Sequence, residues 1–471
     1  MTLTISGDDY TDRLVEQGAK VSQSLSESFG QIAKQKIYAL RDYDNFFNPF
    51  APAGLFALIN YRGLEVVETD ARGLVVFRGT IQAVQQTDDS LCVITCTEPL
   101  GLFLDWPVEA TDQTTYAGFT VNGAVAQGVA VIPVETGTGL IPDGAVVWFG
   151  QSKVPSYVAT TTDSTGGNTT EITLDRPLEV ALADGDALTV SVPDTTTGPA
   201  ALKAAIQTAA PDVLLDGTFD ILAASDAAAG AEIIINVREQ DDIKLRDYVR
   251  QICEMCRLEL FQKNDGYYTC RRGIEYAGAS LTESLTGDEI CGPVEITFDD
   301  SRLIIGYDLI YKRSANEAAI LSADVDSELV RKHNGIKYWK PVPTAATFAA
   351  LKYMYASEGS ARFFGDAHLD FFCEPLITVN CTAKRAYNSD PNQALDLYVG
   401  KELSLSLRDF VDEPAIITAL EYDNDSMAYS SLVFAINGRR YRAGALVSSS
   451  VLITDAGEAI VTDSFTEIEV W

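Results

Sequence analysis

Four cysteines in the middle of the chain are the residues whose type and spacing could best hold a cofactor. Cys253 and Cys256 form a Cys-x-x-Cys pair, and Cys270 and Cys291 follow it. Zinc and iron–sulfur clusters both take soft ligands of this kind. However, the pair falls at i and i+3 on the apolar face of an expected helix, and no Gly or Pro turn shapes it into a metal knuckle. We therefore favour buried thiols and keep zinc or an iron–sulfur cluster as the alternative.

The other cysteines and both histidines show no catalytic pattern. The N-terminus lacks a basic start and an apolar stretch, so we expect no signal peptide and free thiols in a reducing cytosol. His333 stands beside two basic residues before a turn, and His368 comes just before an expected strand. A loop role for the first and an interface or turn role for the second explain both. Three further thiols lie in apolar strand-like runs: Cys92, Cys373 and Cys381.

The signatures of common enzymes are missing from the sequence. It contains no Gly-x-Ser-x-Gly elbow, His-Glu-x-x-His motif, phosphate loop or dinucleotide fingerprint. Acidic pairs such as Asp241-Asp242 and Asp299-Asp300 could resemble a glycosidase pair, but chance pairs are expected among 67 acidic residues. Asp423-Asn424-Asp425 could bind calcium, and a turn explains it equally well. We expect no enzymatic activity.

Charge and hydropathy limit the classes of function. The 471 residues carry 67 acidic and 35 basic side chains, a net charge of −32. This field opposes a surface that neutralises phosphates, so duplex binding is not expected as the main task. The charge serves either solubility or a surface that DNA passes without adhering. Apolar residues make up 46% of the chain, enough for several buried cores, and no run is long enough to span a membrane.

Residues 1–105 predict a first β domain. An opening strand near Ile5 is followed by a polar amphipathic run at Val21–Leu25 and a long strand at Lys36–Tyr43. A loop rich in Asn, Pro and Phe comes next, and Thr87–Ser90 has the residue types of a hairpin turn. A β meander is predicted over four runs: Leu55–Tyr61, Leu64–Glu68, Leu74–Ile81 and Leu91–Cys96.

Residues 106–195 differ in composition and predict an inserted small β-barrel or sandwich. The segment is rich in Thr, Gly, Ala and Val, and turn signals such as Pro142-Asp143-Gly144 separate its apolar runs. Short strands at this spacing are typical of small barrels. The five expected strands are Val129–Ile132, Ala145–Phe149, Ser156–Ala159, Glu171–Leu174 and Ala187–Val190.

Residues 196–325 predict a mixed domain of strands, helices and a hairpin, together with part of a second β domain. Helices are expected at Pro199–Ala209, before Pro211, and at Lys244–Arg257, where apolar residues recur on one face. The hairpin turns at Asn264–Gly266. Strands are expected at Glu232–Val237 and Arg302–Arg313.

Residues 326–445 predict a helix followed by a second β domain, and residues 446–471 an extended arm. The helix is expected at Ala345–Phe364. The fold class is therefore mainly β (α+β). The first and last β segments share a meander character that is too weak to indicate a duplication from sequence alone. The strands of the last segment are expected at Leu369–Ala383, Lys401–Leu407, Ala415–Tyr422 and Ser430–Ile436.

In this order of segments, the chain resembles the central baseplate or tail-tip hub proteins of tailed bacteriophages. The resemblance is one of pattern over most of the length and has no invariant motif. The stretches that carry it are Ile5–Asp12 with Asn48–Phe50 and Phe77–Ile81, Ile233–Arg271, Ile304–Arg313, and Val399–Leu405 with Ile416–Asp423.

The resemblance implies a homotrimer in which each subunit contributes two tube-like β domains to a ring of pseudo-sixfold symmetry. Such a ring joins a hexameric tail tube to a central spike or fibre and surrounds the DNA channel. The implied partners are further copies of the chain, distal tail or tube proteins, the spike or fibre, the C-terminus of the tape-measure protein, and DNA in transit only. No membrane insertion is implied. The implied location is the virion tail, assembled in the cytoplasm of the bacterial host.

Other readings of the same pattern stay open. The chain could form a hexameric distal-tail ring, or it could be a tail protein that grips host glycan through residues 106–195. No lysozyme or peptidase domain is recognisable. Some tail-tip proteins of non-contractile phages carry an iron–sulfur cluster, which keeps the cluster alternative for the four central cysteines open, although their spacing matches no such motif.

Overall fold

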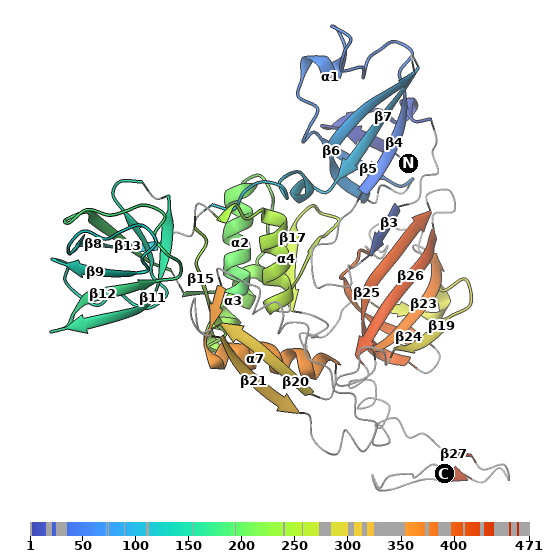
Figure 1. Cartoon of the computed structure of the whole chain (residues 1–471). Coiled ribbons are helices and arrows are strands. Elements are labelled where there is room, and N and C mark those ends of the chain that lie inside the picture. The colour runs from blue at the N-terminus through green and yellow to red at the C-terminus, as the bar shows by residue number, and fades with distance from the viewer. Residues whose placement is uncertain are drawn as a thin grey trace.

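The structure is a computed structural model of the whole chain, and it confirms a mainly β fold with helices in the middle. Figure 1 shows two sheets, a barrel and a group of helices. The structure describes residues 2–15, 21–24, 35–71, 73, 75–88, 90–109, 113–152, 154–193, 195–238, 241–256, 258–272, 284–299, 306–312, 318–324, 354–372, 376–384, 397–407, 410–423, 428–437, 452–453 and 459–460.

The first sheet has six strands in the order β2-β1-β5-β6-β7-β4, and neighbouring strands are antiparallel. Its side chains alternate between core and solvent, as expected for a sheet with one buried face. The predicted strand at 74–81 runs on without a break to residue 88. The bounds are β1 (Thr2–Ile5), β2 (Asp8–Asp9), β4 (Gln35–Arg41), β5 (Glu65–Thr69), β6 (Val75–Asp88) and β7 (Leu91–Thr97).

The strand predicted at Leu55–Tyr61 is wrong, because the structure has the short helix α1 (Leu55–Leu58) there. A short apolar run does not distinguish a strand from a helix. The chain turns tightly at Gly54, where a Cβ would lie 2.2 Å from the Asn48 carbonyl oxygen. This turn lets Phe56 enter the core beside Phe47.

The inserted segment forms a closed barrel of six strands, in the order β10-β11-β12-β9-β8-β13. The sequence predicted five of them, and the missed one, β8, is rich in Thr and lacks an apolar run. The first and last strands are neighbours, with Gln113 opposite Pro193. The bounds are β8 (Gln113–Val121), β9 (Val131–Glu135), β10 (Val146–Phe149), β11 (Ser156–Thr165), β12 (Asn168–Leu174) and β13 (Ala187–Pro193).

The middle of the chain packs helices against short sheets around an apolar core of its own. The predicted helices are confirmed as α2 (Gly198–Ala209) and α4 (Leu245–Cys256). A third helix, α3 (Thr218–Ala228), has no clear apolar stripe, so its sequence did not indicate it. The strands are β14 (Thr195–Thr197), β15 (Glu232–Ile235), β16 (Leu258–Gln262), β17 (Tyr268–Arg272), β20 (Gly306–Lys312), β21 (Ala318–Asp324) and β22 (Met354–Ala356).

The helix predicted at Ala345–Phe364 is displaced toward the C-terminus. Strand β22 occupies Met354–Ala356, and helix α7 runs over Glu358–Phe372. The Ser357 hydroxyl accepts a hydrogen bond of 3.0 Å from the Ser360 amide and so caps the helix start. Because α7 continues to Phe372, the strand predicted from Leu369 begins only at Leu376.

The second large sheet has seven strands, in the order β18-β24-β25-β26-β23-β19, with β3 pairing with β25 beside β24. β3 is the polar run near the N-terminus, which crosses over to this sheet. All pairs are antiparallel except β18 with β24. The bounds are β3 (Val21–Ser24), β18 (Ser284–Thr286), β19 (Glu295–Asp299), β23 (Leu376–Lys384), β24 (Glu402–Leu407), β25 (Phe410–Asp423) and β26 (Ala428–Asn437).

One apolar cluster contains residues of both large sheets, from Leu3 in β1 to Ile436 in β26. The two sheets therefore share one apolar core. Of the predicted C-terminal arm, the structure describes only the two-residue strands β27 (Leu452–Ile453) and β28 (Ala459–Ile460), which pair with each other. Within the described part of the chain, no helix is long and apolar enough to cross a membrane.

Candidate functional site

The two large sheets contain the same four-strand unit. In the first sheet, strands β4, β5, β6 and β7 follow one another in sequence and lie in the order β5-β6-β7-β4. In the second, β23, β24, β25 and β26 lie in the corresponding order β24-β25-β26-β23. In both units the first strand returns to the edge beside the last, a Greek-key arrangement, and all pairs are antiparallel. We call these the first and the second repeat.

The same turn precedes the second strand of each repeat. In Tyr61-Arg62-Gly63-Leu64, the Leu64 amide donates to the Tyr61 carbonyl oxygen at 3.2 Å. In Tyr398-Val399-Gly400-Lys401, the corresponding distance is 3.1 Å. The glycines have φ values of +86° and +91°. A positive φ at the third position of a four-residue turn is what a type II turn requires, and glycine adopts it without strain.

Each turn is bonded to an isoleucine in the long third strand of its repeat. The Gly63 amide donates to the Ile81 carbonyl at 3.0 Å, and the Ile81 amide donates back to the Leu64 carbonyl at 3.0 Å. In the second repeat, Gly400 and Ile417 are joined at 2.7 Å, and Ile417 and Lys401 at 3.0 Å.

A β-bulge follows each of these isoleucines. The pairing of β6 with β7 shifts between Ile81 and Ala83, and that of β25 with β26 shifts between Ile417 and Ala419. Both third strands have 14 residues. A bulge bends a strand and increases its twist, so both strands curve at the same place. The shared sequence signal is Tyr-x-Gly before the second strand and Ile-x-Ala in the third, too sparse to detect without the structure.

The two repeats are fastened to each other at a buried seam. β3 comes just before the first repeat in the sequence, yet it pairs with the second repeat, Val21–Ser24 lying opposite Ala419–Tyr422. Behind this pairing, the Tyr422 hydroxyl bonds a carboxylate oxygen of Asp70 at 3.3 Å, and both side chains are buried. A strand exchange combined with a buried polar contact fixes the angle between the sheets more firmly than apolar packing alone.

The hairpin β16–β17 of the middle domain packs against the second turn. The Phe261 ring lies so close to Gly400 that a Cβ there would be 2.7 Å from it. The Arg271 guanidinium donates to the Gly400 carbonyl at 2.9 Å and pairs with Glu259. The Asn264 amide group also donates to the Leu397 carbonyl at 3.3 Å. Glycine at position 400 is thus required by its backbone and by its surroundings.

The first repeat encloses a buried ion pair. Lys36 in β4 and Glu68 in β5 are paired, and the Tyr38 hydroxyl donates to the same carboxylate at 2.6 Å. Strands β6 and β7 lie between β5 and β4 in the sheet. The side chains of Lys36 and Glu68 therefore meet because the sheet curls over its buried face. Burial raises the pKa of Tyr38 well above its ordinary value, and it lowers the pKa of Lys36 despite the partner carboxylate.

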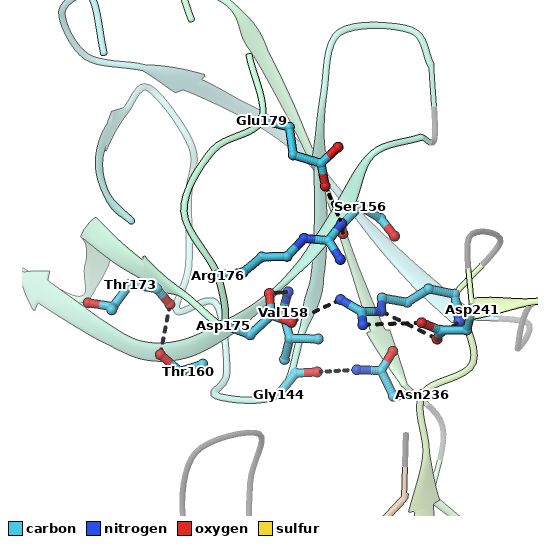
Figure 2. A network of polar contacts seen from close by, with 11 residues as sticks. Gly144, Ser156, Val158, Thr160, Thr173, Asp175, Arg176, Glu179, Asn236 and Asp241 are labelled. Atoms are coloured by element: carbon cyan, nitrogen blue, oxygen red, sulfur yellow. Dashed lines mark hydrogen bonds and ion pairs between the residues drawn. The ribbon is translucent and has the colours of Figure 1, made fainter. Parts of the chain in front are cut away.

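The barrel is joined to the middle domain through Arg238, whose partners Asp175 and Asp241 are labelled in Figure 2. Its guanidinium donates to Asp175 of the barrel at 2.9 Å and to Asp241 of its own loop at 3.2 Å. Nearby, the Asn236 amide group donates to the Gly144 carbonyl at 3.3 Å. Burial opposes the positive charge of Arg238, but the two carboxylates outweigh it and raise the pKa. A planar fork held between two carboxylates fixes orientation as well as distance.

The structure places three of the four central cysteines together and the fourth elsewhere. Cys253, Cys256 and Cys270 lie in the apolar core of the middle domain. Burial raises the pKa of each of these thiols, which keeps them protonated. Cys291 is exposed in the loop between β18 and β19, where its amide donates to the Thr382 carbonyl of β23 at 2.9 Å. Among the described residues, no group of three or more His, Cys, Asp or Glu is arranged to hold a metal ion.

The remaining candidate residues lie in separate elements or outside the described residues. Asp241 is engaged by Arg238, and Asp242 next to it is exposed. His368 lies within helix α7 and Asp299 ends β19. Outside the described residues are His333, Cys373, Asp300 and the turn at 424–426.

Comparison with known proteins gives likenesses of fold. No protein-family model and no curated protein matches the chain. Among solved structures, the 43 kDa tail protein of prophage MuSo2 from Shewanella oneidensis is 10% identical, with 93% of this chain and 97% of that one covered at a TM-score of 0.42. A tail protein from Neisseria meningitidis MC58 is 8% identical, with 93% and 96% covered at 0.44. The type VI secretion component c3393 of E. coli, described as similar to the T4 bacteriophage tail proteins gp27 and gp5, is 8% identical, with 93% and 77% covered at 0.38.

Proposed function

We propose that the chain is a structural subunit of a phage-type tail tip or baseplate, and that three copies form a hub ring. The observation that carries the proposal is the internal repeat, with its shared strand order, turn and bulge. A chain with two equivalent sheet units presents six of them when it assembles as a trimer. Such a ring has sixfold character toward a hexameric tube and true threefold symmetry toward a trimeric spike or fibre.

The buried seam between the repeats supports a mechanical role. β3 pairing and the Asp70–Tyr422 contact hold the two sheets at one fixed angle. A ring closes only if each subunit is rotated from the next by the same angle. A rigid contact between the two sheets of one chain therefore favours one number of subunits. The barrel is attached to the middle domain through Arg238 and is not part of the two large sheets.

The charge of the chain fits a conduit for nucleic acid. A net charge of −32 per copy repels phosphates, so DNA in transit would pass without being trapped. In this proposal the ring surrounds the DNA channel, contacts distal tail or tube proteins on one side and a spike or fibre on the other, and seats the end of the tape-measure protein. The chain would then be located in the virion tail and would have no enzymatic activity of its own.

Electron microscopy of the purified full-length chain tests this proposal. We expect ring-shaped particles with threefold symmetry and six similar lobes around a central opening, with a smaller barrel projecting from each copy. Particles with six copies would favour a distal-tail ring, the alternative that also uses sheet repeats. Particles without a ring would overturn the proposal.

A further inference from the structure

Among the described strands, none covers the outer edge of β6 in the first repeat at the place where β3 covers the second repeat. β5 pairs with β6 as far as Thr80, and the turn at Gly63 adds the bonds to Ile81. Beyond the bulge, none of the described strands pairs with this side of β6 at Ala83–Gln85. The side chains of Gln82, Ala83 and Gln85 are exposed.

The equivalent edge of β25 is occupied by β3. Counted from the bulge, Ala83 corresponds to Ala419, Val84 to Leu420 and Gln85 to Glu421. β3 pairs antiparallel with Ala419, Leu420 and Glu421. The difference is visible in burial, because Leu420 is 5% exposed whereas Val84 is only half-buried.

The edge at Gln82–Gln85 lacks the charges and prolines that usually protect an edge strand, and its bulge does not prevent pairing, because β3 pairs with β25 beyond the equivalent bulge. Natural proteins block such edges with lysines, prolines, bulges that turn the edge away, or a covering segment. Gln82–Gln85 contains no charge and no proline. The opposite edge of the same sheet is partly covered by the chain itself, because Leu14 bridges to Leu40 and the Val15 amide donates to the Ala39 carbonyl at 3.0 Å.

We propose that the edge of β6 at Ala83–Gln85 accepts an extended segment from a second copy of this chain, in the way that β25 accepts β3. β3 shows that this chain uses an uncharged four-residue strand to join one repeat to the next. The chain uses β3 on its own second repeat, and none of the described strands pairs with the first repeat in the equivalent way. In a ring of alternating repeats, the body next to the first repeat is the second repeat of the neighbouring copy.

The inference rests on the proposed ring and names the contact that closes it. The uncharged residues 82–85 add no local repulsion between two copies that each have a net charge of −32. Backbone pairing at such an edge supplies affinity, and the side chains on either face of the strand supply the register.

Photo-crosslinking on the full-length chain tests the contact. The native mass is measured first, and p-benzoylphenylalanine is then placed at position 85 or, as a control, at position 180 in the barrel, where Val180 is exposed. We expect irradiation to join two copies from position 85 and not from position 180. We also expect amides of residues 82–86 to exchange at least about tenfold more slowly in the assembly than after dilution to monomers.

A charged variant of the edge provides a second readout. Ala83→Glu with Gln85→Glu should dissociate the assembly without lowering the melting temperature of the monomer, because both side chains are exposed and the added charges increase the repulsion between copies. Val180→Glu should leave the assembly intact. A wild-type chain that stays monomeric contradicts the ring itself and this contact with it. An assembly that forms, yet gives no copy-to-copy crosslink from position 85 or only crosslinks within one chain, overturns this inference and leaves the proposed function standing.

Discussion

Gly400 and Gly63 hold equivalent positions in the two repeats but have different surroundings. Both have a positive φ, near +90°. Beside Gly400 a Cβ would meet the Phe261 ring at 2.7 Å, whereas beside Gly63 the nearest atom is Leu102 Cδ1 at 3.8 Å. The repeats thus share a backbone requirement, and only the second adds a packing requirement.

Alanine at each glycine separates the two requirements. Gly63→Ala should cost about 1–2 kcal/mol of unfolding free energy, the cost of a left-handed backbone for a residue with a Cβ. Gly400→Ala should cost roughly 1–3 kcal/mol more, because it also forces Phe261 to move. Urea unfolding of both variants measures the difference. Equal losses would contradict the tight packing of Phe261 against Gly400.

Buried thiols and tyrosines predict a loss of stability at alkaline pH. Burial raises the pKa of Cys92 and of Cys381 from about 9 to about 12, and it raises the pKa of Tyr268 well above its ordinary value. The unfolded chain therefore releases these protons at a lower pH than the folded chain does. Stability falls wherever the folded state binds more protons, so the loss begins near pH 9 and continues to about pH 12.

The opposing group is Lys36, whose pKa is lowered by burial and which favours the folded state as pH rises. It is one group against six buried thiols with raised pKa values, so the net effect remains destabilising. Urea midpoints at several pH values between 7.5 and 10.5 should stay level up to near pH 9 and decrease above it. Cys92→Ala should make the decrease shallower, and a constant midpoint would show that the thiols are hydrated. The six thiols are those of Cys92, Cys96, Cys253, Cys256, Cys270 and Cys381.

Arg238 holds the barrel by its charge, so its replacement should loosen the joint. Arg238→Met leaves the carboxylates of Asp175 and Asp241 partly buried without their cation, at a cost on the order of 3 kcal/mol. Arg246→Met is the matched control, because Arg246 pairs with Asp105 at 3.1 Å in an exposed position. That variant should cost less than about 1 kcal/mol. Limited proteolysis should cut only the first variant faster near the joint, and equal rates would contradict the anchoring role.

At the scale of elements, the barrel is built as a removable insertion. Its first and last strands are neighbours, with Gln113 opposite Pro193, so the chain leaves the barrel where it enters. Figure 1 shows the barrel beside the helices, on the side away from the two large sheets. Its contacts with the middle domain include the Arg238 and Asn236 groups.

Replacing residues 113–193 with a short Gly/Ser linker should therefore leave the rest of the chain folded. Arg238→Gln, made in the same variant, removes the charge that the excised Asp175 no longer balances. We expect the shortened chain to assemble with the same number of copies as the full chain, measured by light scattering coupled to size-exclusion chromatography. A shortened chain that is monomeric would place the barrel in the assembly contacts. Loss of binding to host cells with unchanged assembly would support the glycan-binding alternative for this module.

The elements show which features local sequence patterns can predict. Alternation and turn residues predicted most strands of both sheets, and an apolar stripe predicted α4. Leu55–Tyr61 was misjudged because a short apolar run does not distinguish a strand from a helix, and α3 was missed because it has no apolar stripe. The pairing of β3 with β25 joins residues about 400 positions apart, and no local pattern records it. For the same reason, the repeat was visible in sequence only as a vague meander.

For the candidate site, sequence reasoning was strongest about the classes of chemistry. The absence of enzyme motifs agreed with a structural protein. The expectation of a structural role in an assembly rested on the resemblance to tail hub proteins more than on any single residue. The central cysteines drew attention, but Cys291 lies in a loop beside the second sheet, away from the core that holds the other three. The residues that define the repeat, among them Gly63, Gly400 and Ile417, carry no reactive group, so a search for chemistry passes over them.

At the scale of the whole molecule, two equivalent sheets in one rigid chain are the central feature. Their shared turn and bulge give both sheets the same curvature, and the seam at β3 sets the angle between them. The negative charge works against association, so copies should assemble more completely when salt screens the repulsion. These properties support the ring that we propose, in which the sheet units are twice as many as the subunits.

Native mass spectrometry of the full-length chain, at micromolar concentration and moderate ionic strength, tests this account most directly. The account predicts one dominant species with three times the 51.0 kDa mass of the chain. A chain that remains monomeric under these conditions would contradict it.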